Sequence, residues 1–532
     1  MFRKTAPQRP LFSVEATLDA TKRTRLERTW AHQYRSHALP LIDETQFAQY
    51  FDPANGRPNK SVRLVVSLLV LKEMFDLTDL EVLEQLEWNT AWHYALDLTP
   101  EEAHLCQKTL HNHRTLLLAD DQGAELFEGT TARLIQAAGL RTSRQRQDST
   151  HILSNIKVLT RLGLFVATLT QFLEALRREH PRLCGQVDEA LRGRYLDREG
   201  YFADARSSEA PRRLAEAALD VYRLVQQFAE HQTVAKLEAY LLLARLYAEQ
   251  CVTPTSEAPE RIELQERPSS GSLQTPTDPD VTYGHKGKGY EVQLNETCAE
   301  ENPFEAVTAV SVNGANESDQ HQVEPALAQT ERTCGAAPEQ LHTDAGYGSG
   351  ENIVDAKEQH GTELMAPIGS KASEQHLPVG DFTFDAAGRT VLACPAGQTP
   401  LRQQTTRAGK TTLAWFVEAE CRQCPFRHQC PVEKRRGGRV LKFNAAAVAV
   451  ARRRVEQETP AFKEQHKIRS GIEATNSELK RRHGLGKLRV RRRVRVELAV
   501  RLKVLALNFK RYVSHLVETC VAAPAVCPTC AD

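Results

Sequence analysis

The chain has 532 residues, of which 41% are hydrophobic and 26% are charged. This length is too great for one hydrophobic core, and the composition excludes global disorder. The longest apolar run near the start, residues 64–71, is far shorter than the roughly 20 residues that cross a bilayer. The charged start lacks the apolar segment of a secretion signal, so we expect a cytoplasmic protein with no membrane partner.

Residues 1–58 are predicted to be an N-terminal arm, which ends in a stretch broken by Pro53, Gly56 and Pro58. Residues 59–140 are predicted to form a small all-helical domain, because apolar residues recur there at three- and four-residue spacing. Thr78 followed by Glu81 resembles a capping box, the side-chain pair that begins many helices. Such a domain could bind DNA, but a packed helical bundle with no DNA role is the default interpretation of this pattern.

Residues 141–152 are predicted to be the first strand of a catalytic core. A helical insertion is expected at 153–251, where Leu, Ala, Arg and Glu dominate with helical periodicity. Residues 252–280 are rich in Pro, Ser, Thr and Gly and are predicted to be an exposed, flexible linker.

The region 281–370 alternates strand and helix signals. Strand patterns at 288–294 and 306–312 are followed by a helical pattern at 320–333. A strand at 340–343, an acidic helix that ends at His360 and a last strand at 363–367 come next. This order predicts an α/β fold with a mixed sheet flanked by helices.

Two acids stand at informative places along this pattern. Asp148 lies in RQRQDSTHI, at the junction between an extended stretch and the next segment, where it either serves a site or caps the next helix. Asp344 lies in LHTDAGYGSG, where a strand meets glycines. Carboxylates at strand ends occupy the edge where open α/β sheets bind ligands. The alternative for Asp344 is an ordinary Asp that opens a glycine turn.

The sequence turns irregular at 371–447, which contains Cys394, Cys421, Cys424 and Cys430 in the spacing C-x26-C-x2-C-x5-C. Four thiolates suit a closed tetrahedral zinc site, so a small, irregular, zinc-bearing insertion with a structural Zn²⁺ is predicted. His428 is interpreted as a solvent-exposed side chain rather than a ligand. Three more cysteines, Cys520, Cys527 and Cys530, form an incomplete set in a predicted disordered tail at 518–532.

The last part of the core, residues 448–517, is predicted to be helical and basic. Residues 467–511 contain 15 Lys and Arg but only three acids, which favours a polyanionic partner such as DNA over a solvated helix face. Arg469, Glu473 and Lys480 are spaced to share one helix face. A surface salt-bridge ladder is the alternative for these three residues.

At these residues the chain resembles the DDE transposases of bacterial insertion sequences, in the group with a Tyr-x2-Arg-x3-Glu-x6-Lys signature. Arg469, Glu473 and Lys480 hold the Arg, Glu and Lys positions of that signature, and His466 stands where the family has Tyr. The segments RQDSTHI and HTDAGYGS resemble those around the family's two Asp residues. The helical stretch that begins GRPNKSVRLVV resembles the front domain of these enzymes.

The resemblance implies an RNase-H-like catalytic sheet with an all-α N-terminal domain. It assigns Asp148, Asp344 and Glu473 as catalytic ligands of two Mg²⁺ or Mn²⁺ ions, and it implies a homodimer on paired DNA ends. Six cations are then predicted to bind DNA: Arg469, Lys480, Arg481, Arg482, Lys487 and Arg489. The predicted function is DNA cleavage at element ends and strand transfer into target DNA. The alternative is a transposase-derived, sequence-specific DNA-binding regulator without nuclease activity.

Overall fold

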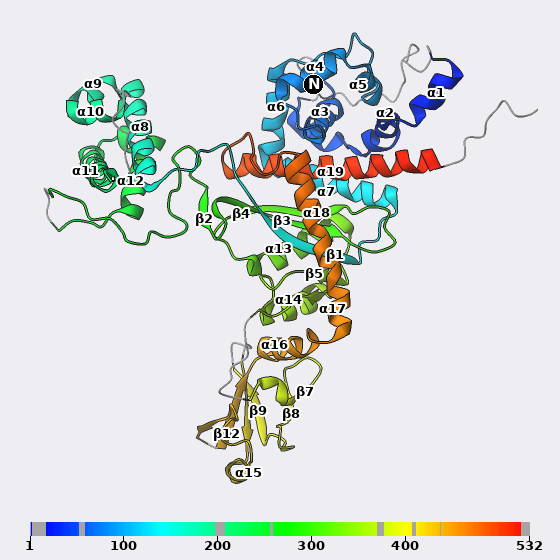
Figure 1. The fold of residues 1–532 in the computed structure, drawn as a ribbon, viewed down its shortest axis with the longest axis vertical. Coiled ribbons are helices and arrows are strands. Elements are labelled where there is room, and N and C mark those ends of the chain that lie inside the picture. Colours follow the sequence, from blue (N-terminus) through cyan, green and yellow to red (C-terminus); the bar gives the residue numbers. More distant parts are fainter. Residues whose placement is uncertain are drawn as a thin grey trace, which may run out of the picture.

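The computed structural model of the chain describes residues 2, 18–52, 59–196, 208–255, 259–369, 377–406, 411–436 and 438–522. The molecule has four parts (Figure 1). The central part is a sheet with its own helices. The helices of the N-terminal domain lie above it, a helical insertion lies to the upper left, and a β-rich domain lies below. Pro53, Gly56 and Pro58 of the predicted arm lie outside the described residues.

The N-terminal region is helical, as predicted, but its helices begin at Ala20 rather than at residue 59. The prediction of an arm over 1–58 is wrong for the residues described there, because Tyr34, Ile42 and Phe47 are buried in the same core cluster as residues 62–71. Thr78 and Glu81 form the predicted capping box, since the Thr78 hydroxyl accepts a hydrogen bond from the Glu81 amide and the Glu81 carboxylate accepts one from the Thr78 amide. Helix α3 (Val62–Met74) is largely apolar and is buried over most of its length. It packs against α19 (Arg493–Ala522), the long last helix of the chain. The helices of this domain are α1 (Ala20–Glu27), α2 (Trp30–Gln33), α3 (Val62–Met74), α4 (Asp79–Trp88), α5 (Thr90–Ala95), α6 (Gln107–Leu118) and α7 (Gln122–Ala138).

The central sheet is mixed, as predicted. Its strands are β1 (Arg144–Ile152), β2 (Thr282–Gly284), β3 (Gly287–Thr297), β4 (Val307–Gly314), β5 (Gln340–His342) and β6 (Glu363–Met365). Five of them lie in the order β4-β3-β1-β5-β6, and short β2 pairs with the start of β3. β3 is antiparallel to both of its neighbours, β4 and β1, whereas β1, β5 and β6 are parallel. Helices α13 (Val323–Cys334) and α14 (Gly350–His360) follow the strands, so the predicted order of elements is confirmed.

The region 153–251, which the sequence predicts as a helical insertion, is largely helical in the structure. It contains α8 (Arg161–Glu179), α9 (Pro181–Gln186), α10 (Glu189–Leu196), α11 (Ala210–Phe228) and α12 (Glu238–Gln250). Phe165, Phe172 and Leu243 are fully buried in a cluster of its own, which is separate from the cluster beneath the sheet. The insertion therefore has its own core, and it leaves the sheet after β1 and returns before β2 (Figure 1).

The prediction of an exposed linker at 252–280 is wrong for its second half. Leu273 and Asp278 are fully buried. The hydroxyls of Ser154 and Tyr290 donate hydrogen bonds to the Asp278 carboxylate, at 2.5 and 3.0 Å. A composition rich in Ser and Thr suggested solvent exposure, but buried polar groups are stable when they hydrogen-bond one another.

The sequence predicted that the cysteine-rich region is irregular. This prediction is wrong, because the region forms a small antiparallel β domain. Its strands are β7 (Thr383–Phe384), β8 (Val391–Ala393), β9 (Arg402–Thr405), β10 (Thr412–Phe416), β11 (Glu433–Arg435) and β12 (Gly438–Phe443), with helix α15 (Glu418–Gln423) between β10 and β11. Four strands form a sheet in the order β11-β12-β10-β9. Phe416, Leu441 and Phe443 are buried together, so the domain has an apolar core that its Gly- and Pro-rich sequence concealed.

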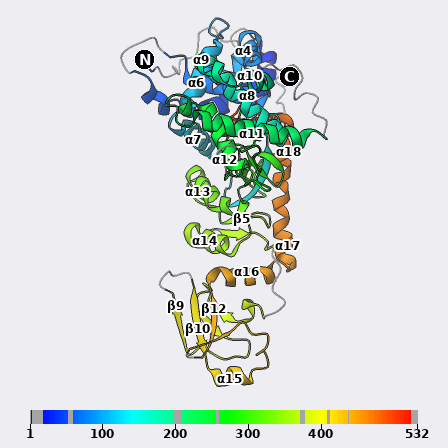
Figure 2. The ribbon, with the colours of Figure 1, turned by 90° about the vertical axis from the view of Figure 1, so that its left-hand side faces the viewer.

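The C-terminal part is helical, as predicted. Helix α16 (Ala445–Glu456) connects the β domain to α17 (Pro460–His466), a 3-10 turn η9 (Lys467–Gly471) and α18 (Ile472–Arg482), and α19 (Arg493–Ala522) ends the described chain. Figure 2 shows α17 and α18 running along one side of the core, from the level of the β domain to the sheet. Within the described ranges, no helix combines the length and apolar character needed to span a membrane.

The predicted tail at 518–532 begins too early, because α19 continues to Ala522 and carries Cys520. Cys527 and Cys530 lie outside the described residues.

Candidate active site

Asp148 lies in the interior of β1, paired with Leu294 of β3, so the alternative that it caps a helix is wrong. The parallel register pairs Arg146 with His342 of β5. Because the two strands advance together, Asp148 comes level with the residue two positions after His342, which is Asp344. The sheet thus brings together two acids that are 196 positions apart in the sequence.

Asp344 follows the end of β5, as predicted. Its Oδ1 accepts a hydrogen bond of 2.7 Å from the Gly346 amide, so the glycine turn considered as an alternative is present as well. A Cβ atom on residue 346 would lie 2.9 Å from that same oxygen. Glycine at this position therefore leaves the carboxylate room, and the side chain of Asp344 is 41% exposed.

Glu473 and Arg469 complete the cluster. Arg469 lies in η9 and Glu473 is the second residue of α18. The Arg469 guanidinium lies 3.3 Å from Asp148 Oδ1, 3.7 Å from Asp344 Oδ2 and 3.5 Å from Glu473 Oε1. All three predicted acids therefore gather around one cation.

A buried network fixes η9 and α18 against the sheet. Glu296 of β3, which is fully buried, accepts hydrogen bonds from Arg146 at 2.7 Å and from the Thr475 hydroxyl of α18 at 2.6 Å. Arg146 also donates to the carbonyl of Ile468 at 2.9 Å. A Cβ atom on Gly471 would lie 2.0 Å from that guanidinium, so glycine is required there for the close approach.

The surroundings of Asp148 oppose its ionisation. Burial raises the pKa of its carboxyl and nearby Asp344 adds to the effect, while Arg469 and the Ser149 amide act in the opposite direction. Asn476 of α18 donates a hydrogen bond of 3.1 Å to Asp148 Oδ2. The carboxylate is thus held from both sides, by Arg469 on one oxygen and by Asn476 on the other.

Sequence reasoning missed two residues of this neighbourhood, Asn476 and Asp319, and assigned no contact to His466. Asn476 lies three residues after Glu473, and helical spacing would have placed it on the same side of α18. The ring of His466 donates a hydrogen bond of 2.9 Å to the carbonyl of Thr343, which precedes Asp344. Asp319 is a further nearby acid whose pKa is raised by burial, with a contribution from Asp344; no sequence pattern singled it out.

The predicted DNA-binding cations differ in their surroundings. Lys480, Arg481, Arg482 and Lys487 are exposed. Arg489 donates a hydrogen bond of 2.6 Å to the carbonyl of Leu77 and pairs with Asp76 at 3.5 Å. It therefore connects the core to the N-terminal domain, a role that the sequence did not suggest.

The basic segment 467–511 has more ion pairs than the sequence predicted. Its own three acids are few, but Lys503 pairs with Glu73 and Arg501 with Asp121, both of the N-terminal part. Arg511 contacts Glu296 at 3.3 Å. Much of the charge of α19 is thus neutralised inside the protein, whereas the cations of α18 are exposed.

The four predicted zinc ligands, Cys394, Cys421, Cys424 and Cys430, line one pocket of the β domain. Burial and the neighbouring cysteines raise the pKa of the Cys421 and Cys430 thiols. His428 is exposed, as predicted. Over the ranges that the structure describes, no group of three or more His, Cys, Asp or Glu side chains lies close enough together to hold a metal ion.

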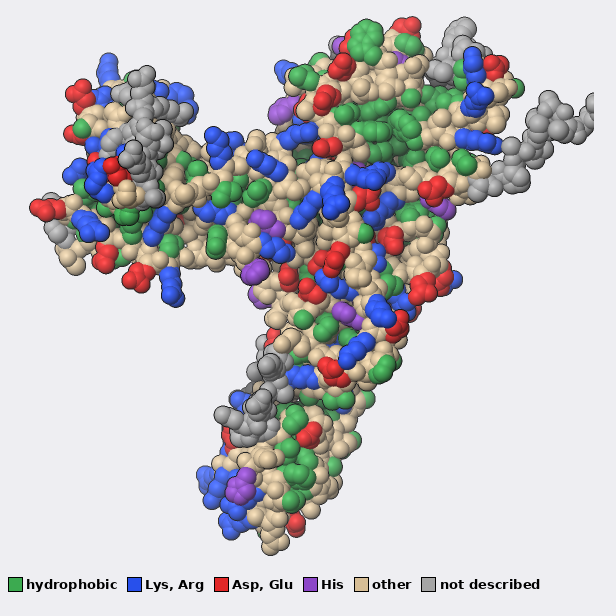
Figure 3. All heavy atoms as spheres, in the orientation of Figure 1, with side chains coloured by type: hydrophobic (Ala, Val, Ile, Leu, Met, Phe, Trp, Pro, Cys, Tyr) green, Lys and Arg blue, Asp and Glu red, His purple; other side chains and the backbone are tan. Residues whose placement is uncertain are grey.

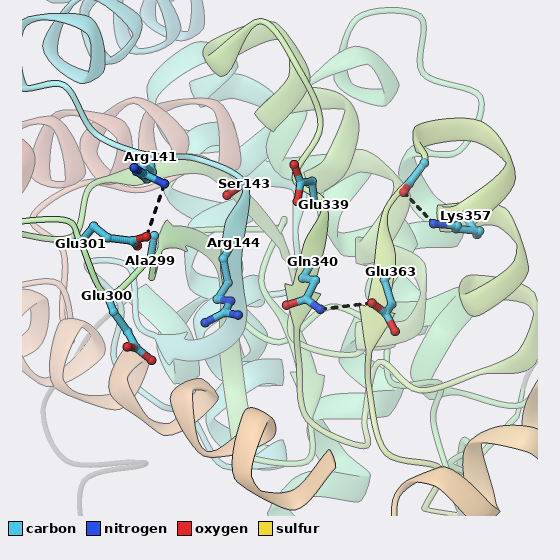
Figure 4. Close-up of a pocket in the computed structure, with 11 residues that line it drawn as sticks. Arg141, Ser143, Arg144, Ala299, Glu300, Glu301, Glu339, Gln340, Lys357 and Glu363 are labelled. Carbon is cyan, nitrogen blue, oxygen red and sulfur yellow. Dashed lines mark hydrogen bonds and ion pairs between the residues drawn. The ribbon is translucent and has the colours of Figure 1, made fainter. Parts of the chain in front are cut away.

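A second hollow lies at the opposite edge of the sheet (Figure 4). It surrounds Arg144, Gln340 and Glu363, the first residues of three parallel strands, whereas Asp344 follows the end of β5. Its charges are mixed and partly paired, for example Arg141 with Glu301 at 3.4 Å. This hollow is therefore separate from the carboxylate cluster.

Two protein-family models match segments of this chain. Residues 393–513 match the transposase DDE domain, and residues 31–116 match a transposase domain (DUF772). The first match includes Glu473 and all four clustered cysteines, and it begins after Asp148 and Asp344. The search of curated proteins and the search of solved structures each found no match.

The first of these matches indicates an enzyme, because the DDE domain belongs to a family of nuclease and strand-transfer enzymes. More particularly, the chain carries the DDE domain of a transposase together with an N-terminal transposase domain, and DDE transposases use divalent metal ions.

Proposed function

We propose that this chain cleaves DNA at the ends of an insertion sequence and joins the freed 3′-hydroxyl to target DNA, using Asp148, Asp344 and Glu473. The observation that carries this proposal is the convergence of these three carboxylates on Arg469. Their oxygens come from a strand interior, a strand end and a helix start, which are rigid supports for a site.

The proposed core is RNase-H-like. The strand order β4-β3-β1-β5-β6, with three antiparallel strands followed by two parallel additions, supports this assignment. When short β2 is left out of the count, Asp148 lies on the first strand of the core and Asp344 follows the fourth strand, β5. Glu473 lies on a late helix, α18. The signature residues Arg469, Glu473 and Lys480 support membership of the group named for that signature, with His466 in the Tyr position.

The donor set suits hard divalent cations. Mg²⁺ and Mn²⁺ prefer carboxylate oxygens, and three such groups contact the one guanidinium of Arg469 in this site. Asp148, Asp344 and Glu473 would hold two ions, which when bound stabilise the attacking and leaving oxygens at phosphorus. Arg469 and Lys480 would hold phosphates beside them, and Arg481, Arg482, Lys487 and part of the Arg489 guanidinium would bind the DNA backbone.

Several further assignments accompany this function. The N-terminal helical domain would bind DNA, and two copies of the chain would act on paired ends. A structural Zn²⁺ would bind Cys394, Cys421, Cys424 and Cys430, whose common pocket supports a four-thiolate site. The cytoplasmic location expected from the sequence belongs to the same proposal.

A cleavage assay on supercoiled DNA with Mg²⁺ or Mn²⁺ tests the proposal. The parent is compared with Asp148→Asn, Asp344→Asn and Glu473→Gln, and Asp355→Asn is the matched control because Asp355 is an exposed acid of α14. Each of the three variants is expected to lose at least about 100-fold in rate while it still binds DNA, and the control to cut normally. Equal cutting by the parent and Glu473→Gln would overturn the enzymatic assignment. Binding without cutting by the parent would support a regulator instead.

A further inference from the structure

The end of the β domain carries a concentration of positive charge that the proposed active site does not use. Residues 421–442 contain seven Lys and Arg but one acid, Glu433. In the space-filling view, Lys and Arg side chains gather on the lower left of this domain (Figure 3). The domain lies at the opposite end of the molecule from the N-terminal helices (Figure 1).

Five of these cations form what we call the basic face: Arg422, Arg427, Lys434, Arg436 and Arg439. They come from α15, the turn after it and the β11–β12 hairpin. Arg422, Lys434 and Arg439 surround Glu418 and hold the pKa of its carboxyl below the usual value. Arg427 and Arg439 line the pocket that also contains the four cysteines Cys394, Cys421, Cys424 and Cys430. The five side chains are thus supported by one compact scaffold.

Pairing within the domain leaves most of this charge unbalanced. Glu418 contacts Arg422 at 2.9 Å and Lys434 at 3.8 Å, so one carboxylate serves two cations. Arg427 and Arg436 are exposed, and among the residues that the structure describes they have no ion-pair partner. The Nε of Arg439 is buried without a hydrogen-bond partner in the same described part. This arrangement contrasts with α19, where Arg501, Lys503 and Arg511 find acids inside the protein.

The basic face is also not needed for packing. The apolar core of the domain consists of side chains such as Phe416, Leu441 and Phe443, and the four exposed cations of the face lie outside it. Unbalanced, exposed guanidinium and ammonium groups on a rigid support are suited to a polyanion, because each neutralised phosphate releases a condensed counterion. Arg also matches phosphate geometry with paired hydrogen bonds.

We propose that the basic face is a second DNA-binding surface, which holds the phosphate backbone of duplex DNA beyond the carboxylate cluster. This inference rests on the proposed function, since it takes DNA as the substrate. One view of the molecule shows both these cations and those gathered over α18 and α19 (Figure 3), so a duplex crossing that side of the protein meets both groups. The contacts are to phosphates and carry no base specificity.

The test uses the full chain and a triple variant, Arg427→Gln, Lys434→Gln and Arg436→Gln. The matched control replaces three exposed cations of the helical insertion, Arg177, Arg182 and Lys236, by Gln. Binding to a short and a long duplex of arbitrary sequence is measured by fluorescence anisotropy over a range of NaCl concentrations. Thermal unfolding verifies that both variants fold.

For the long duplex, the slope of log affinity against log salt is expected to fall by about three in the triple variant and to stay unchanged in the control. The short duplex cannot contact both groups of cations at once, so its slope is expected to change less in the triple variant than the slope for the long duplex. Equal slopes for the parent and the triple variant on the long duplex would overturn the inference and leave an acidic protein as the partner to seek.

The two proposals fail in different ways. If the parent binds DNA with the expected salt dependence but never cuts it, the proposed chemistry fails and the basic face stands. If the triple variant cuts and binds long DNA like the parent, the basic face fails and the chemistry stands. A parent that binds no DNA would overturn both.

Discussion

The guanidinium of Arg469 lies 3.3 Å from the carboxylate of Asp148. The same group lies within 3.7 Å of Asp344 and 3.5 Å of Glu473, so it neutralises oxygens that we propose as metal ligands. A divalent ion and this guanidinium therefore compete for the same donors. The signature Arg would then have two roles, as a counter-ion of the acids and as a ligand of DNA phosphates.

Replacing Arg469 by Gln is expected to separate these roles. Mn²⁺ binding in the absence of DNA should tighten by about ten-fold, which corresponds to ~1.4 kcal/mol, because the competing cation is gone. DNA cleavage should nevertheless fall, because a phosphate contact is lost. Isothermal titration with Mn²⁺ and the supercoil cleavage assay measure the two effects. Arg182→Gln, at an exposed position of α9 in the helical insertion, is the control; unchanged or weaker Mn²⁺ binding by Arg469→Gln would contradict competition.

Asp148→Asn is expected to stabilise the protein in the presence of EDTA. Burial raises the pKa of Asp148 in the folded chain, so the folded state binds the proton more strongly than the unfolded state does. Stability from this group is therefore present at low pH and is lost as pH rises through the raised pKa. At neutral pH the Asn variant lacks that unfavourable charge, and its free energy of unfolding should increase by on the order of 1 kcal/mol.

Urea unfolding at pH 7 and at pH 4 measures this effect. The gain should shrink at the lower pH, because the carboxyl of the parent then takes up its proton. Asp355→Asn, at an exposed position, should change little at either pH. A variant that is less stable than the parent at pH 7 would show that the contacts of Asp148 with Arg469 and Asn476 outweigh its burial.

The sequence predicted the sheet and the helical parts well because each has a period that its side chains repeat. A strand at 141–152 was predicted, but Asp148 was placed at its junction with the next segment rather than in its interior, because RQRQDSTHI contains one strongly apolar residue, Ile152, and resembles a surface segment. Its polar side chains are satisfied by distant partners, for example Arg146 by Glu296. The linker at 252–280 was misjudged for the same reason, because the partners of Asp278 are 124 and 12 positions away.

The candidate site was predictable only in part. The acids Asp148, Asp344 and Glu473 followed from the resemblance, and the structure brings them together around Arg469. Asn476 and His466 act through contacts across the fold, with Asp148 and with the Thr343 carbonyl. Local sequence does not specify such contacts. The fate of the cations could not be predicted either, since Glu73, which pairs with Lys503, is 430 positions away.

Glu296→Gln is expected to destabilise the fold strongly. This carboxylate is fully buried and receives hydrogen bonds or ion contacts from Arg146, Thr475 and Arg511. Removing its charge breaks the ion pair with buried Arg146 and the contact with half-buried Arg511, and breaking a buried pair typically costs about 3–5 kcal/mol. Urea unfolding measures the loss. Glu305→Gln is the matched control, because Glu305 also contacts Arg146, at 3.6 Å, but is 45% exposed; equal effects of the two variants would contradict a special role for Glu296.

The four-cysteine pocket leads to a prediction about metal content. Purified protein is expected to contain about one zinc per chain by elemental analysis, and Cys424→Ser should lower that content severely, because a tetrahedral site needs all four ligands. Cys106→Ser, at an exposed cysteine of the N-terminal part, should retain the metal.

Zinc should also be lost as pH falls, since bound thiolates must be deprotonated and burial already raises the pKa of Cys421 and Cys430. Because the β domain has its own apolar core, metal removal should loosen it rather than unfold the whole chain. Limited proteolysis with and without a chelator measures this, with new cleavage expected between β8 and β12. Equal zinc content in Cys424→Ser and the parent would exclude these cysteines as the ligands, and the basic face would then be supported by the sheet and its apolar core alone.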